Sequence, residues 1–125
     1  MSSVFGPFEL ICPLAAGGMA ITHLARIHGA APGREFVLKR IRPEIASEAE
    51  LRGLFEVEAS MAKGLQHPNI VRTLHDGDVD GELYLALEYV WGADLRDIGK
   101  AARRHKAPFP PTLIARIIAD AARGL

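Results

Sequence analysis

The chain has 125 residues, 49% of them hydrophobic and 24% charged, which is enough for one compact domain with a modest core and excludes two. Fifteen basic residues balance fifteen acidic ones, so no overall charge draws the chain toward nucleic acid or an anionic membrane. No signal-peptide pattern opens the sequence and no apolar run approaches the roughly 20 residues of a membrane helix, so we expect a cytoplasmic protein without a membrane segment.

Alternating apolar residues predict three strands in the first third of the chain. The first runs from Phe8 to Leu14 and places Cys12 on its apolar face. Because Cys12 is the only cysteine, it has no partner for an internal disulfide, and we expect a buried structural thiol rather than a reactive one. Further strands are predicted at residues 20–27 and 35–41, so that the three form a meander.

One amphipathic helix is predicted from about Glu48 to Lys63. Ser47 and Glu50 have the spacing of a capping box at its start. The residues that then recur at helical spacing are Leu51, Leu54, Phe55, Glu58, Met61 and Leu65. The helix is expected to end at Gly64, and a His-Pro-Asn turn is expected to lead into a strand at residues 70–75.

The pair Asp80-Gly81 predicts a two-residue hairpin between a strand that ends at Val79 and an alternating run at residues 82–89. The expected fold class is therefore α+β, with a five-stranded antiparallel sheet and one helix. The pattern then changes to a short helix at 94–104, a proline-rich link at 105–111 and a last helix from Thr112. That helix carries a wide apolar stripe, which ought to pack against something that the chain does not contain.

Gly17 and Gly18 lie between the first two predicted strands. Glycines in such a place let backbone amides approach and cradle phosphate oxygens. The same two residues are equally compatible with an ordinary hairpin loop. On these residues alone, both interpretations stay open.

Lys39 and Glu58 are the two charged residues whose predicted positions ask for an opposite charge. Alternation turns Lys39 toward a half-buried face, where it either meets an anion or extends to solvent. Glu58 lies on the apolar stripe of the predicted helix, where it needs a cation unless it reaches water at the margin. Because each satisfies the other's need, we expect them to pair and to hold the lysine within reach of a phosphate.

Five short motifs follow one another along the chain. They are Gly-Gly-Met-Ala at 17–20, Val-Leu-Lys at 37–39, Phe-Glu-Val-Glu-Ala at 55–59, His-Pro-Asn-Ile-Val at 67–71 and Leu-Glu-Tyr-Val at 87–90. This ordered set resembles the N-lobe of the protein kinase family, and in particular bacterial serine/threonine kinases. The resemblance implies an N-lobe at residues 1–90, followed by the hinge and two helices of C-lobe type at 91–125, as an incomplete domain.

The resemblance also implies that the chain binds ATP. Gly17 and Gly18 would lie above the triphosphate, Lys39 would contact its α and β phosphates, and Glu58 would hold Lys39. Leu87 would be the gatekeeper, the backbone of Glu88 and Val90 would bind the adenine edge, and Asp94 would lie near the ribose or a basic substrate. The full implied nucleotide-binding set is Leu14, Gly17, Gly18, Met19, Thr22, Val37, Lys39, Leu87, Glu88, Val90 and Asp94.

The loop departs from the family pattern at three positions. Ala15 and Ala20 stand where the first and third glycines are usual, and Thr22 stands in place of a valine. We expect the Cβ of Ala15 to limit positive φ and to hold the loop away from the phosphates. We expect the Thr22 hydroxyl to weaken packing over the adenine. Together these changes predict reduced, but not abolished, affinity for ATP.

The sequence contains neither His-Arg-Asp with its downstream Asn nor Asp-Phe-Gly, which in the family supply the base and the magnesium ligands. No histidine has metal-ligand spacing, so no metal site is expected in the chain. We expect part of a serine/threonine kinase that is inactive alone and needs a C-lobe on a partner or further segment, and then a protein substrate. One alternative is a non-catalytic, pseudokinase-like module that binds nucleotide or protein. Another is a small α+β fold unrelated to kinases, in which Lys39 and Glu58 are only a structural pair.

Overall fold

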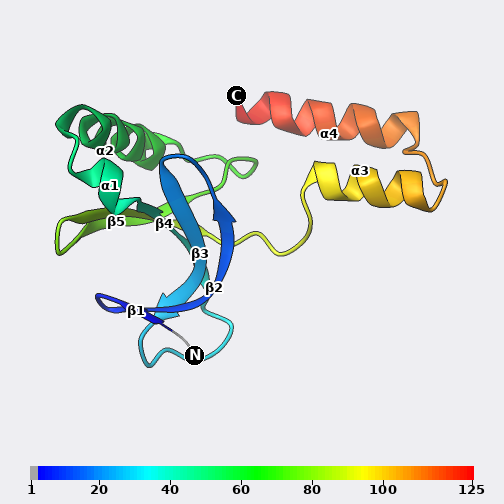
Figure 1. Cartoon of the computed structure of the whole chain (residues 1–125). Coiled ribbons are helices and arrows are strands. Elements are labelled where there is room, and N and C mark those ends of the chain that lie inside the picture. Colours follow the sequence, from blue (N-terminus) through cyan, green and yellow to red (C-terminus); the bar gives the residue numbers. More distant parts are fainter. Residues whose placement is uncertain (1–2) are drawn as a thin grey trace. The chain divides into compact units, whose positions relative to one another are not determined.

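A computed structural model describes residues 3–125 of the chain (Figure 1). In chain order its elements are β1 (Ser3–Phe5), β2 (Phe8–Ala16), β3 (Ala20–Ile27), β4 (Phe36–Ile41), α1 (Pro43–Ala46), α2 (Ala49–Gly64), β5 (Thr73–Val79), β6 (Glu82–Glu88), α3 (Leu95–Arg104) and α4 (Pro111–Gly124). They form two compact units. The first runs to Gln66 and resumes at residues 71–89, and the second contains residues 67–70 and 90–125.

The first unit is built on a six-stranded sheet with the order β1-β2-β3-β4-β6-β5, in which every neighbouring pair is antiparallel. The expected α+β class is confirmed, but the sheet has one strand more than the five expected. The extra strand, β1, has only three residues, too few to show an alternating pattern. It turns back onto β2 through Gly6, whose φ of +53° lies in the left-handed region that glycine tolerates.

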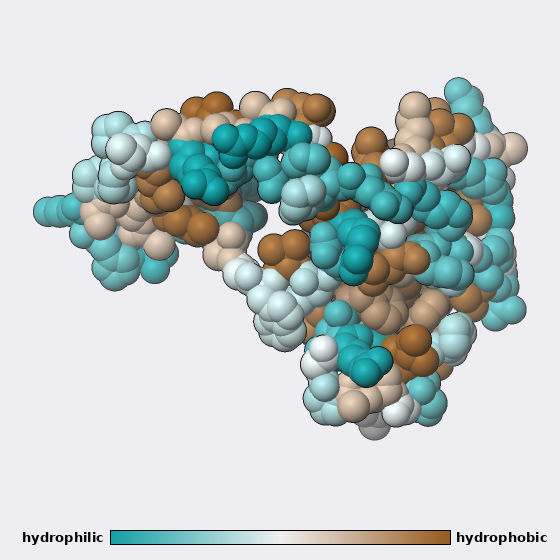
Figure 2. Space-filling view, turned by 180° about the vertical axis from the view of Figure 1, so that it is seen from behind, coloured by the Kyte–Doolittle hydropathy of each residue, from teal (hydrophilic) through white to brown (hydrophobic). Residues whose placement is uncertain are grey.

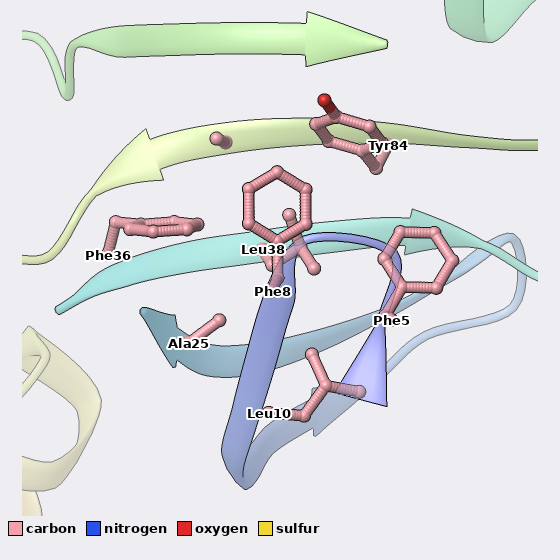
Figure 3. Packing of buried hydrophobic residues seen from close by; sticks show 8 residues of the cluster. Phe5, Phe8, Leu10, Ala25, Phe36, Leu38 and Tyr84 are labelled. Atoms are coloured by element: carbon pink, nitrogen blue, oxygen red, sulfur yellow. The ribbon is translucent and has the colours of Figure 1, made fainter. Parts of the chain in front are cut away.

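One face of the sheet carries an aromatic core (Figure 3). Its buried residues are Phe5, Phe8, Leu10, Ala25, Phe36, Leu38, Tyr84 and Ala86. The rings of Phe8 and Tyr84 meet edge to face, with centroids 5.0 Å apart, which is a favoured arrangement for aromatic pairs. Leu38 at the centre of β4 is completely buried. This core holds β1, β2, β3, β4 and β6 together.

The opposite face of the sheet packs against α2. Its buried residues are Ile41, Phe55, Ala59, Leu83 and Leu85. Lys39 lies on this face, because it alternates with Leu38 and Arg40 and its Nζ lies 6.0 Å from the centre of the Phe55 ring. The predicted orientation of Lys39, together with Ile41, is confirmed.

The predicted long helix is present as α2, but its start differs from the expectation. The predicted capping box is wrong, because the N-cap is Glu48 and makes no side-chain cap hydrogen bond. The Ser47 hydroxyl instead donates to the carbonyl of Glu44. The physical reason is α1, a short helix not predicted from the sequence, which ends at Ala46 and makes Ser47 its C-cap.

The apolar stripe of α2 is narrower than predicted. Phe55 and Ala59 are buried, but Leu54 is 57% exposed and Met61 is 70% exposed. Glu58 lies on the side of the helix between these two groups, at the margin of the buried stripe. It is therefore beside the core rather than inside it.

Two further expectations about the strands are corrected. Cys12 is exposed rather than buried, because β2 has irregularities between Leu10 and Cys12 and between Pro13 and Ala15, and each such bulge changes the face to which the following residues point. The strand predicted at residues 70–75 begins only at Thr73. Before it, the amide of Ile70 bonds to the carbonyl of His67, so the turn is longer than expected.

The second unit contains α3, α4 and the turn at residues 67–70. Asn69 Nδ2 donates to the carbonyl of Asp120 in α4 at 2.8 Å, which fixes this turn to the helix. None of the residues of α4 is buried, and Figure 2 shows hydrophobic residues, in brown, on the surface of this helical unit. The side chains of Leu113, Ile114 and Ile118 in α4 are exposed. Across residues 3–125, no helix combines the length and the apolar character of a membrane span.

Leu38→Ala is expected to lower the free energy of unfolding of the first unit by about 2 to 5 kcal/mol, because it leaves a cavity in the aromatic core. Leu54→Ala, on the exposed side of α2, is the matched control and is expected to change it by about 0.5 kcal/mol or less. Urea denaturation followed by far-ultraviolet circular dichroism measures the free energy of unfolding of both variants. Equal losses for the two variants would contradict the assignment of the core.

Candidate functional site

The first unit brings Lys39 and Glu58 into direct contact. Lys39 lies in β4, paired with Thr22 of β3 on one side and Leu85 of β6 on the other. Its Nζ donates to Glu58 Oε1 across a distance of 2.8 Å. The predicted pairing is therefore present, and it connects the centre of the sheet to α2.

The exposure of this pair bears on what it can do. The Lys39 side chain is 28% exposed and that of Glu58 is 55% exposed. An ion pair this accessible contributes little to stability, typically about 0 to 1 kcal/mol. One bond to Glu58 also uses only one of the three Nζ protons. The lysine is thus oriented by Glu58 and still able to bind an anion.

Gly17 and Gly18 form the exposed end of the β2–β3 hairpin. The turn is closed by a bond from the Gly17 amide to the Ala20 carbonyl at 2.9 Å. Neither glycine has a positive φ, and a Cβ built on Gly18 would have no atom within 4 Å. The fold of the chain therefore does not require a glycine at position 18. A ligand that approaches the loop closely would require it, because a Cβ there would stand in its way.

We expected the Cβ of Ala15 to limit positive φ in the loop, but the backbone at Ala15 does not adopt a positive φ. Ala15 is a strand residue opposite Thr22 and does not have a positive φ, so its Cβ causes no strain. The hydroxyl of Thr22 donates to the carbonyl of Ala15 at 3.2 Å. The polar group that we expected to disturb adenine packing is thus already satisfied within the hairpin.

Sequence reasoning missed Arg42, which follows β4 and contacts the same loop. Its Nε donates to the carbonyl of Gly17 at 2.9 Å, and its main-chain amide donates to the carbonyl of Met19 at 2.9 Å. The only signal in the sequence was a basic residue three positions after Lys39. Alternation alone does not indicate that its side chain reaches the hairpin.

Two ion pairs fix α2 to the β5–β6 hairpin. Arg52 donates to Asp78 Oδ2 at 2.6 Å and to the carbonyl of Gly81 at 2.9 Å. Lys63 donates to Asp76 Oδ1 at 2.6 Å. The hydrogen bond from Arg52, and then that from the Gly81 amide, hold the pKa of the Asp78 carboxyl below its ordinary value. Because these contacts lie on both sides of Glu58 along the helix, they keep it opposite Lys39.

The other residues of the implied nucleotide set lie in both units. In the first, Leu14 and Met19 are exposed on β2 and the loop, and Val37 and Leu87 are cross-strand neighbours. The backbone amide of Glu88 bonds to the Arg72 carbonyl, and its side chain accepts from the Arg72 amide. Val90 and Asp94 belong to the second unit. There Asp94 caps α3 by accepting from the Asp97 amide at 2.8 Å.

Among residues 3–125, no group of three or more His, Cys, Asp or Glu side chains is arranged to hold a metal ion. The site therefore consists of one oriented lysine, its carboxylate partner and a hairpin with two exposed glycines. This donor set suits a polyanionic ligand such as a nucleotide triphosphate.

Known proteins are similar to this chain over nearly its whole length. The kinase domain of PknI from Mycobacterium tuberculosis, a solved structure, superimposes with a TM-score of 0.71 at 28% identity and covers 98% of this chain and 48% of that one. Serine/threonine-protein kinase PknF from the same species is 34% identical over 127 residues. The chain belongs to the protein kinase family. It has the fold of a kinase N-lobe.

The relatives are much longer than this chain, and their names give different specificities. The alignment with PknF covers 98% of this chain and 25% of that protein. Tyrosine-protein kinase MasK from Myxococcus xanthus is 38% identical over 124 residues, which cover 97% of this chain and 19% of that protein. No family model matches the chain.

Glu58→Gln is expected to change the free energy of unfolding by about 1 kcal/mol or less, because the pair that it weakens is exposed. Glu50→Gln, at an exposed position in the first turn of the same helix, is the matched control. Urea denaturation compares the two. A loss of about 3 kcal/mol or more for Glu58→Gln alone would instead indicate a buried, structural pair.

Proposed function

We propose that this chain is the ATP-binding portion of a protein kinase. The observation that carries the proposal is the contact between Lys39 and Glu58, at 2.8 Å, on a sheet whose β2–β3 hairpin ends in exposed glycines. A lysine that is oriented but still accessible, with a loop of exposed glycines nearby, has the chemistry to bind the phosphates of a nucleotide.

In this proposal each part of the first unit has a role. Gly17 and Gly18 cover the triphosphate, Lys39 contacts the α and β phosphates, and Glu58 holds Lys39 in place. The adenine would be packed and bound by Leu14, Met19, Thr22, Val37, Leu87, Glu88 and Val90, with Asp94 near the ribose or a basic substrate. Magnesium would accompany the nucleotide and neutralise its phosphates, with protein ligands from outside these 125 residues.

The reaction of the complete kinase would be transfer of the γ-phosphate of ATP to a protein. We propose serine or threonine as the acceptor, since PknF is named as a serine/threonine kinase, although MasK is named as a tyrosine kinase. The 125-residue chain alone would not carry out the transfer, because it has no His-Arg-Asp or Asp-Phe-Gly motif to position the acceptor and the metal.

The exposed apolar residues of α4 support a further part of the proposal. Leu113, Ile114 and Ile118 offer a surface that a C-lobe, on the same or another chain, would bury. We also propose a cytoplasmic location, a reducing compartment in which the exposed Cys12 would stay free. A non-catalytic module that binds nucleotide would use the same site.

Binding of ATP with magnesium to the purified chain, measured by calorimetry, tests the proposal. Saturable binding is expected, and Lys39→Ala is expected to weaken it at least about tenfold, which corresponds to about 1.4 kcal/mol, because the phosphate contact is lost. Lys100→Ala, an exposed lysine of α3, is the control and is expected to bind as tightly as the unaltered chain. No binding to the folded chain, or equal binding by Lys39→Ala, would contradict the proposal.

A further inference from the structure

Arg42 stands where three elements of the first unit meet. Its main-chain amide donates to the carbonyl of Met19, and its own carbonyl accepts from the amides of Ile45 and Ala46, each at 2.9 Å. It is therefore at once the last partner of the β3–β4 ladder and the N-cap of α1. This anchoring fixes the position from which its side chain extends.

The side chain of Arg42 uses this position to hold the glycine hairpin. Its Nε donates to the carbonyl of Gly17 at 2.9 Å. In a planar trans peptide the carbonyl of one residue and the amide of the next point in opposite directions. Fixing the Gly17 carbonyl toward Arg42 therefore turns the Gly18 amide away from Arg42. The same reasoning applies to the Met19 carbonyl and the Ala20 amide.

The direction in which the Gly18 amide is turned follows from the strand. Arg42 comes three residues after Lys39, and side chains separated by an odd number of residues along an extended chain point to opposite faces. An amide turned away from Arg42 thus faces the side of the sheet that carries Lys39. A carbonyl in that place would repel a phosphate, whereas an amide donates to it.

The positive charge of Arg42 also favours an anion at this loop. Within residues 3–125, Arg42 forms no ion pair with a carboxylate, and its side-chain hydrogen bond goes to the neutral carbonyl of Gly17. A guanidinium stays charged at any physiological pH. Its positive charge beside the loop is therefore not cancelled by the chain, and it adds to the attraction of Lys39 for an anion.

We infer that Arg42 is a positioning residue, which orients the Gly17–Gly18 peptide so that the Gly18 amide faces the phosphates of a bound nucleotide. The inference rests on the proposed function, since it concerns the same site. It adds a residue that acts through the loop rather than through contact with the nucleotide. A purely structural role, as strand partner and N-cap, uses only the backbone of Arg42 and would be preserved in any variant but proline.

The test compares binding of ATP with magnesium and binding of adenosine, both followed by NMR titration of the full 125-residue chain. In Arg42→Ala we expect the Kd for ATP to rise about fivefold or more and the Kd for adenosine to change less than about twofold, because the Gly17–Gly18 peptide that Arg42 orients faces the phosphates and not the adenosine. We also expect the Gly18 amide of the nucleotide-free protein to become more mobile in backbone relaxation measurements, since Arg42 no longer holds its peptide.

Two further variants make the outcome decisive. Arg42→Lys keeps the charge and the backbone contacts but loses the planar donor group. Its Kd for ATP is expected to lie between that of the unaltered chain and that of Arg42→Ala. It replaces Arg42→Ala if that variant does not fold. Arg34→Ala, at an exposed arginine in the β3–β4 connection, is the control and is expected to leave both Kd values unchanged.

An unchanged Kd for ATP in Arg42→Ala, or an equal rise for ATP and adenosine, would overturn the inference while leaving the proposed function intact. If the unaltered chain bound neither ligand, the proposed function would fail and the inference with it. A rise confined to ATP, together with greater mobility of the Gly18 amide, would support both.

Discussion

The contact between Lys39 and Glu58 joins the sheet to α2 at the point where a ligand would bind. Its accessibility means that it contributes little to stability. The rest of the first unit supplies the stability instead. The aromatic core fixes β4 from one side, and the buried face of α2 closes on it from the other.

The arrangement of charges around this contact keeps its geometry without burying it. Arg52 and Lys63 tie α2 to the hairpin of β5 and β6 at two points along the helix. Arg42 ties the glycine hairpin to the end of β4. Each of these bonds is modest alone, but together they restrict the helix and the loop on either side of Lys39. A site of this kind is preorganised for a polyanion and still open to it.

The structure could be predicted from the sequence where a pattern extends over several residues. It could not be predicted where a single contact determines the position of a residue. Strands β3, β4 and β6 follow from alternation, and the Lys39–Glu58 pair follows from two charges on apolar faces. The three-residue β1 and the four-residue α1 are too short to show a period. The exposure of Cys12 depends on bulges in β2 that no residue type announces, and the role of Arg42 depends on a loop that folds back to it.

Residue-resolved NMR of the chain during titration with ATP and magnesium is a direct test of whether Lys39 and Glu58 form a nucleotide site. We expect the amide signals of Gly17, Gly18 and Lys39 to move together and to saturate at one ligand concentration, and the Lys39 Nζ signal to move with them. Shifts confined to the helices of the second unit, or no shifts in a folded protein, would contradict the claim that Lys39 and Glu58 form a nucleotide site.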